Sequence, residues 1–257
     1  MRHASRYLPG VIALLCMAPV SRTEAANYRV GPGEKYATVL AVASKLKAGD
    51  VVEITGDISD SFAITSLGTP EKPVTIRGVT RVEDGRTVRP EITPASPSVP
   101  YIIKCEGGWT VIEGLGLSGF TGQEWGKAAL IHGCRNLVLR NCHFHHNVRT
   151  IWSDGNEPGD ILVEFCEFES NGYAGFGPAA LYSANPLATA TVQYCYVHDG
   201  TGSTDMRVCF ARNVIRYNWF ESLYKFALQV TTTEFGPDDV GRAAAEAFYP
   251  THSDIVG

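Results

Sequence analysis

Five short segments carry the residues that are best suited to chemistry, because they place different side chains at one repeated position. Trp152 and Tyr182 are aromatic at that position, Arg207 is basic, and Asp205 lies two residues before the arginine. Aromatic rings offer flat apolar faces on which sugar rings can stack, and the planar fork of arginine binds carboxylates. The segments are ALIH (129–132), TIWS (150–153), ALYS (180–183), DMRV (205–208) and ALQV (227–230).

The alternation within these segments predicts which side chains face outward. Successive side chains of a β-strand point to opposite faces, and the second residue of each segment is apolar. We expect these apolar residues to point into a core. The third residues then form one outward column, which consists of Ile131, Trp152, Tyr182, Arg207 and Gln229, with Ala129, Thr150, Ala180, Asp205 and Ala227 beside it.

A second phrase recurs between these segments and indicates the architecture. In each copy, aliphatic residues alternate before a small or amide residue, and these small or amide positions are 23 to 29 residues apart. A period in the twenties, built from alternating strands, is typical of a solenoid whose turns bury their apolar sides by stacking. The small or amide positions are Cys142, Cys166, Cys195 and Asn218, and Leu115 holds this position in a weaker copy.

The segments outside the repeats are expected to close or flank the coil. Residues 37–47 have a helical pattern, and we expect an amphipathic helix that caps the N-terminal end. The polar stretch 231–250 follows the last of the five segments and is interpreted as an insertion. HSDIVG (252–257) begins another repeat and stops, which suggests a chain truncated within the coil.

Residues 1–26 have the composition of a secretory signal peptide. Arg2 and Arg6 precede an apolar stretch that is too short to span a bilayer, and Ala25 and Ala26 offer a cleavage point. No later stretch of the sequence is apolar enough to span a membrane. We therefore expect a secreted or periplasmic protein with one domain over residues 27–257.

The net charge argues against one class of partner, and the cysteine positions indicate whether disulfides are expected. The chain has a formal net charge of −5, and about −7 without residues 1–26, so it has no electrostatic footprint for nucleic acid. Six of the seven cysteines follow the signal peptide, and disulfides are usual in exported chains. Because three cysteines hold the same position in successive turns, we expect a column of buried, reduced thiols. A disulfide between neighbours needs suitable side-chain vectors.

Together with the signal peptide and the repeats, the segments GDVVEI (49–54) and TPEKPVTIRGV (69–79) resemble exported bacterial proteins of the pectate-lyase-like superfamily. The resemblance implies an all-β fold, a single-stranded right-handed parallel β-helix with three strands per turn and an N-terminal capping helix. In that architecture the sugar-binding groove usually runs along the first sheet, which would contain the outward column. The fold supports lyases, hydrolases, epimerases and adhesins, so it does not by itself define an activity.

The residues of the column favour one chemistry among these. Glycoside hydrolysis needs facing carboxylates about 5–10 Å apart, and the column offers only Asp205. A polysaccharide lyase instead needs a base and a positive charge that stabilises the enolate of an acidic glycan. The resemblance assigns that role to Lys or Arg, often with bound calcium, so no cofactor is certain and calcium is the one it allows. Arg207 is the candidate catalytic residue, and the candidate substrate-binding residues are Trp152, Tyr182, Asp205, Gln229, Arg149 and His198.

Two interpretations of function stay open. One subgroup of bacterial β-helix proteins is similar to residues 180–200, but its His-Asn and Gly-His pairs are replaced here by Ala179-Ala180 and Ser203-Thr204. The chain is therefore a polysaccharide lyase or a degenerate relative of one. Alternatively, it is a non-catalytic glycan-binding protein, an adhesin or an envelope structural protein.

The remaining histidines form the densest group of potential metal ligands. His143 and His145 flank the inward Phe144, so they share the outer face of the third sheet with His146 nearby. Because we expect no carboxylate or cysteine beside them, the pattern favours a solvated face and no metal site. His198 is expected in a loop that approaches the first sheet and its groove.

Overall fold

The computed structural model describes most of the chain apart from its first residues and several internal segments. The expected signal peptide, except for residues 24–26, and the insertion 231–250 lie outside the described residues. Within the described part, no helix has the length and apolar character that a membrane span requires. The described residues are 24–124, 127–153, 159–173, 178–202, 204–221, 226–230 and 252–256.

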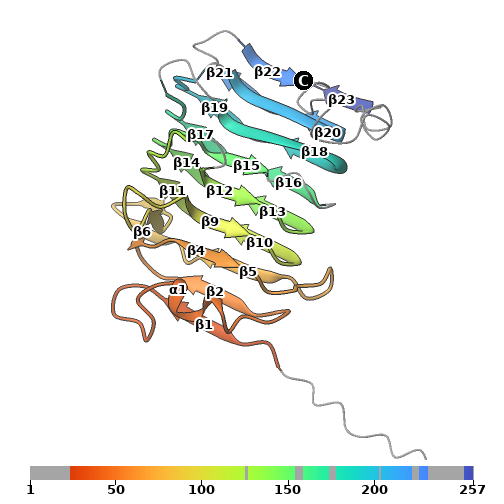
Figure 1. The fold of residues 1–257 in the computed structure, drawn as a ribbon. Coiled ribbons are helices and arrows are strands. Elements are labelled where there is room, and N and C mark those ends of the chain that lie inside the picture. Colours follow the sequence, from red (N-terminus) through yellow and green to blue (C-terminus); the bar gives the residue numbers. More distant parts are fainter. Residues whose placement is uncertain are drawn as a thin grey trace, which may run out of the picture.

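The chain forms a parallel β-solenoid of about seven turns. Its strands stack as successive rungs from β1 at one end to β22 and β23 at the other (Figure 1). A full turn contributes strands to three rows, which follow one another along the chain and which we call the first, second and third rows. This arrangement confirms the predicted all-β parallel β-helix.

The first row contains the segments that predicted the outward column. Its strands pair in parallel and in chain order. β18 and β20 are long because each continues from the first row into the second. The strands are β4 (Phe62–Ile64), β9 (Tyr101–Cys105), β12 (Ala128–His132), β15 (Ile151–Ser153), β18 (Pro178–Gln193), β20 (Thr204–Arg216) and β22 (Phe226–Val230).

The second and third rows complete each turn. The second row contains β1 (Asn27–Val30), β2 (Val51–Ile54), β5 (Val74–Gly78), β10 (Trp109–Glu113), β13 (Asn136–Arg140), β16 (Asp160–Glu164), the later parts of β18 and β20, and β23 (His252–Val256). The third row contains β3 (Ile58–Ser59), β8 (Glu91–Thr93), β11 (Gly116–Ser118), β14 (His143–His145), β17 (Glu167–Glu169), β19 (Tyr196–His198) and β21 (Trp219–Glu221). A separate antiparallel pair joins β6 (Arg81–Glu83) to β7 (Arg86–Val88).

The core consists of the inward residues of all three rows, stacked turn upon turn. In the third row the rings of Phe144 and Phe168 are parallel, with centroids 5.1 Å apart, and both side chains are buried. Leu130, Ile151 and Leu181 stack in the same way in the first row. Burying a large apolar side chain of this kind stabilises a fold by roughly 1.5–3 kcal/mol, so the inward columns hold the register on which every outward position depends.

A corner between the second and third rows holds the predicted column of small residues. Cys142, Cys166 and Cys195 are buried, and each thiol lies 3.3–3.4 Å from the carbonyl oxygen two residues earlier. Asn218 continues the column, since its side-chain oxygen accepts a hydrogen bond of 2.9 Å from the Cys195 N–H. The stacking is therefore confirmed, and the three cysteines form no disulfide in this structure.

The capping helix is shorter than predicted. α1 spans Leu40–Ala43, whereas the pattern indicated residues 37–47. The carboxylate of Asp60 accepts hydrogen bonds from the N–H groups of Val39 and Leu40 at 2.6 and 3.1 Å, which defines where the helix begins. Among the described residues α1 is the one α-helix, and Val39 and Val42 are fully buried against the first turns.

Candidate functional site

The first row brings the predicted outward column into register. Its members pair in the predicted order, which is Ile131, Trp152, Tyr182, Arg207 and Gln229. Because neighbouring strands are about 4.8 Å apart, one member of the column follows another at that spacing along the solenoid. Trp152 and Arg207 are partly exposed, and the side chains of Tyr182 and Gln229 lie outside the described part of the structure.

Trp152 and Arg149 make the best-defined contact on this face. The guanidinium carbon of Arg149 lies 5.7 Å from the centre of the Trp152 ring, which is within the range of a cation–π interaction. Arg149 also donates a hydrogen bond to the backbone oxygen of Glu124. Both residues were candidates for substrate binding, and the structure places them side by side at the start of β15.

The structure adds one basic residue to the column. Lys104 in β9 pairs with Ile131 in β12, so it occupies the same outward position one turn earlier. Its ammonium nitrogen lies 2.6 Å from the carboxylate of Glu106, and its side chain is one quarter exposed. Lys104 was not among the predicted residues, because it precedes the five segments, which begin at residue 129. The alternation around Lys104 is the signal that could have identified it.

Two of the expected exposures are wrong. Ile131 is only 4% exposed and Asp205 only 2%, although their positions face away from the core. Ala129 and Thr150, which lie in the column beside Trp152, are also buried. Alternation assigns a residue to one face of a strand but does not show what packs on that face. The Asp205 carboxylate therefore does not reach solvent as a substrate-binding residue would.

The placement predicted for His198 is also wrong. His198 is the last residue of β19 in the third row and does not lie in a loop near the first row. Its Nδ1 lies 2.8 Å from Asp199 and its Nε2 lies 3.2 Å from Glu167. The ring stacks on Tyr196 with centroids 4.1 Å apart. The apolar alternation of the repeat continues through Val197, and this signal could have placed His198 on a strand.

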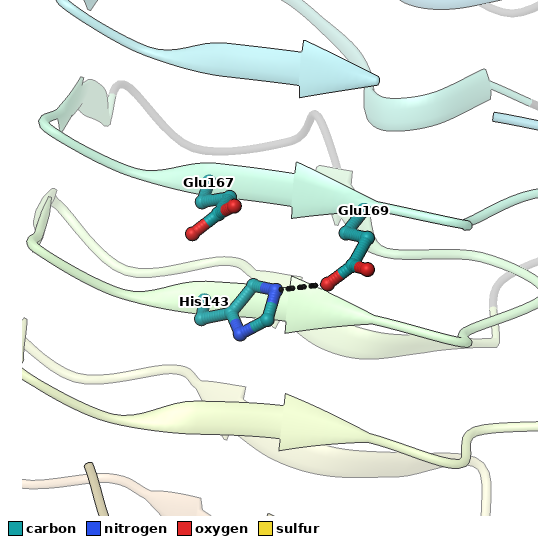
Figure 2. A group of neighbouring side chains, drawn as sticks. All are labelled: His143, Glu167 and Glu169. Carbon is teal, nitrogen blue, oxygen red and sulfur yellow. Dashed lines mark hydrogen bonds and ion pairs between the residues drawn. The ribbon is translucent and has the colours of Figure 1, made fainter. Parts of the chain in front are cut away.

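The third row sets carboxylates directly beside the two histidines that were expected to lack them. β14 and β17 pair so that His143 lies opposite Glu167 and His145 opposite Glu169. The Nε2 of His143 lies 2.9 Å from a carboxylate oxygen of Glu169 (Figure 2). The Nε2 of His145 lies 3.1 Å from Glu91. One turn of the solenoid separates His143 from the glutamates of β17, and two turns separate His145 from Glu91. Residues far apart in the sequence are therefore direct neighbours.

These contacts shift the pKa values of the histidines in different directions. Burial lowers the pKa of His143, and the nearby His145 adds to this effect. The hydrogen bond to Glu91 raises the pKa of His145. Burial lowers the pKa of His198, but its hydrogen bonds to Asp199 and Glu167 outweigh burial and the net shift is upward. Of these three histidines, His143 is therefore the one whose pKa is shifted toward the uncharged form.

Among the described residues, the third row also holds the one cluster of three or more potential metal ligands. The cluster consists of His143, Glu167 and Glu169, and one ligand atom from each lies within 4.8 Å of the others. The outward column of the first row, where calcium was considered, contributes no such cluster among its described residues. Its carboxylate, Asp205, is buried.

The second row carries charged residues of a different kind. Its outward positions alternate between acid and base, and Glu113 lies 3.7 Å from Arg77 and 4.0 Å from Arg140. Arg140 also contacts Glu164 at 2.7 Å. Burial raises the pKa of Glu164, but hydrogen bonds from Gln193 and Arg140 outweigh burial and the net shift is downward. Each of these carboxylates is thus matched by an arginine.

An exposed row of aromatic side chains at the corner before the cysteine column was not predicted. Phe165, Tyr194 and Tyr217 are each about half exposed, and their rings stack with centroids 5.1 and 5.3 Å apart. All three have positive φ angles of 54–57°, which bulky residues rarely adopt. Each lies directly before a residue of the small or amide column, so the repeat pattern could have predicted this aromatic row.

Comparison with known proteins adds little to this picture. No family model matches the chain, and no curated protein matches it. Two solved structures are similar, both of the pectin methylesterase from Aspergillus niger, one deglycosylated and one penultimately deglycosylated. The alignments cover 81% of this chain and 87% of each of those chains at 10% identity, with TM-scores of 0.35 and 0.34. A likeness this weak carries no argument about fold or function.

Proposed function

We propose that the chain binds an acidic polysaccharide along the outer face of the first row. The observation that carries this proposal is the outward column itself, in which Lys104, Trp152 and Arg207 occupy one position of different turns, with Arg149 against the tryptophan. Basic side chains bind the carboxylates of uronic acids. The tryptophan supplies a flat apolar surface for a sugar ring.

A polymer fits this column better than a single small molecule does. Lys104 and Arg207 are separated by four strand-to-strand steps, from β9 through β12, β15 and β18 to β20. At about 4.8 Å per step, the two charges are roughly 19 Å apart along the solenoid. A chain of several uronic acid residues can reach both. Export, expected from the N-terminal sequence, would bring the protein to such polysaccharides outside the cytoplasm.

The proposed reaction is β-elimination by a polysaccharide lyase. A base removes the proton next to the uronate carboxylate, and the resulting enolate collapses into a carbon–carbon double bond as the bond to the glycosidic oxygen breaks. The departing oxygen takes up a proton from the base or from water and leaves as a hydroxyl group. Arg207 is the proposed base or charge stabiliser, because it is a partly exposed basic residue of the column in register with Tyr182.

The experiment is an elimination assay with the full chain on pectate, alginate and glycosaminoglycans. Unsaturated uronates absorb in the ultraviolet, so turnover gives rising absorbance. We expect Arg207→Ala to abolish this rise and Arg207→Lys to retain part of it, because a lysine with a lowered pKa is also a competent base. Absence of turnover by the wild-type chain, with binding retained in calorimetry, would exclude the lyase but keep the glycan site. Absence of binding to all three polymers would overturn both.

The alternative is a non-catalytic surface protein that binds through a different face. The specific observation in its favour is the exposed aromatic row of Phe165, Tyr194 and Tyr217, because exposed large aromatic side chains in a line often mark an interaction surface. Replacing Tyr194 and Tyr217 by Ser distinguishes the two cases. Loss of glycan binding in that variant, together with unchanged binding in Trp152→Ala, would move the site from the first row to this corner.

A further inference from the structure

We infer that the third row holds a binding site for a divalent transition-metal ion of the zinc type, formed by His143, Glu167 and Glu169. The site goes beyond the proposed function, because it lies on a different row from the glycan column. His143 belongs to β14, and the two glutamates belong to β17, the next strand of the same row.

The geometry of the three side chains suits one ion. Figure 2 shows His143 reaching from β14 toward the carboxylates of Glu167 and Glu169 on β17. Their ligand atoms lie within 4.8 Å of one another, and the closest pair, Nε2 of His143 and Oε2 of Glu169, is 2.9 Å apart. A tetrahedral ion with bonds of about 2.0–2.2 Å separates its ligand atoms by about 3.3–3.6 Å. An ion at this site would therefore require the 2.9 Å pair to move slightly apart.

The charge of this face supplies a second, independent argument. The outward positions of the described third-row strands include four glutamates and neither lysine nor arginine. The side-chain partners of these glutamates carry no fixed positive charge at neutral pH. They are His143, His145, His198, Tyr196 and Trp219. A divalent cation would provide the missing charge. The glutamates are Glu91, Glu167, Glu169 and Glu221.

In the second row, by contrast, the negative charge of the glutamates is compensated by arginines. Its carboxylates Glu53, Glu113 and Glu164 each lie within 4.0 Å of an arginine. The same type of strand, at the same spacing, therefore carries arginine partners in one row and histidine partners in the other. Histidine differs from arginine in one relevant respect, since neutral imidazole is a metal ligand and guanidinium is not.

The mixed donor set selects the kind of ion. One imidazole nitrogen with two carboxylates suits zinc and related first-row metals, whereas calcium takes six to eight oxygen ligands. The Nε2 of His198 lies 3.2 Å from Oε1 of Glu167, a contact that would orient this carboxylate. Three protein ligands leave at least one position on the ion for water.

Zinc titration of the full chain by calorimetry tests the site. The protein carries no histidine tag and is first treated with a chelator and then dialysed. We expect one zinc ion per chain, with affinity weakened at least about tenfold in His143→Ala and in Glu169→Gln. Cobalt should give a weak visible absorption without the charge-transfer band of a thiolate, because Cys105, Cys134 and the three corner cysteines are buried.

Glu113→Gln provides the matched control, because it makes the same chemical change on an outward strand position of the second row. We expect zinc affinity to be unchanged in that variant, and thermal unfolding verifies that every variant is folded. The inference is overturned if wild-type protein binds no zinc. It is equally overturned if the affinity survives in a His143→Ala, Glu169→Gln double variant, or if Glu113→Gln weakens it as much as Glu169→Gln does.

Discussion

The first and third rows come from the same turns and the same alternating strands, yet their outward faces have opposite character. The first row presents Lys104, Arg207 and Trp152, with Arg149 beside the tryptophan. The third row presents glutamates and histidines, among them His143. The difference teaches that the backbone repeat sets the spacing of an outward column, whereas the residue types in it select the ligand. One row is suited to an anionic polymer and the other to a cation.

The second row is the reference for this comparison, because its charged side chains pair with one another. Arg77, Glu113, Arg140 and Glu164 follow one another in register, and each contacts a neighbour of opposite charge. Surface pairs of this kind contribute little net stability, about 0–1 kcal/mol each. The two arginines and two glutamates balance one another, so we expect this part of the row to bind neither ligand.

The largest expected effect separates inward from outward residues of a single strand. Phe168 lies between Glu167 and Glu169 in β17, is 1% exposed and stacks on Phe144. Phe168→Ala should lower the free energy of unfolding by about 3–5 kcal/mol, because it leaves a cavity in the core. Glu169→Gln without metal should lower it by less than about 1 kcal/mol. Denaturant unfolding measures both, and similar losses would show that the outward face is structural.

A smaller effect, on glycan affinity, is expected when the contact between Trp152 and Arg149 in the first row is removed. Trp152→Ala should weaken binding of an oligogalacturonate about tenfold, or about 1.4 kcal/mol, with little change in unfolding. Combining it with Arg149→Ala in a double-mutant cycle should give a coupling energy of about 0.5–2 kcal/mol, because each residue loses its cation–π partner. Calorimetry measures the affinities. Full additivity of the two changes would mean that the pair does not act together.

The smallest expected effect concerns the pH dependence of the second row. The net pKa of Glu164 is lowered because hydrogen bonds from Gln193 and Arg140 outweigh burial. An acid whose pKa is lower in the folded state stabilises the fold above its unfolded pKa, about 4.3. Wild type should therefore exceed Glu164→Gln in unfolding free energy by about 1 kcal/mol at neutral pH.

This difference should disappear as the pH falls through the folded pKa of Glu164, because the carboxyl group is then protonated in both states. Urea unfolding of the two proteins across the acid range measures it. A difference that persists in strong acid would show that the glutamate stabilises the fold through packing and not through charge.

Much of the fold could be predicted from the sequence because the residue types in the repeat clearly prefer either the inward or the outward face of a strand. Alternation placed Leu130 and Ile151 inward and Trp152 outward, and the recurring cysteines identified the corner column. A period-two pattern and a repeat length are local properties of the sequence. They can therefore be recognised without knowing which residues pack around each strand. The same logic gave the order of the outward column.

The errors concern what packs or pairs between turns. The alternation places Asp205 on the outward face of its strand, yet the residue is buried. Alternation assigns a face but does not show which residues cover it. His143 seemed to lack a carboxylate, yet Glu167 lies opposite it one turn later. Finding that pair required the two copies to be aligned on Cys142 and Cys166 and their next residues compared. The helix was too long because Asp60, distant in sequence, defines where it begins.

The most direct test of the account compares two matched arginines on different rows. Calorimetric titration with an oligogalacturonate would be done on wild type, Arg207→Gln of the first row and Arg140→Gln of the second row, after thermal unfolding shows all three folded. The account predicts that Arg207→Gln weakens binding at least about tenfold, or 1.4 kcal/mol, while Arg140→Gln leaves it unchanged. Equal affinities in all three proteins, or a larger loss in Arg140→Gln, would contradict the assignment of the glycan to the first row.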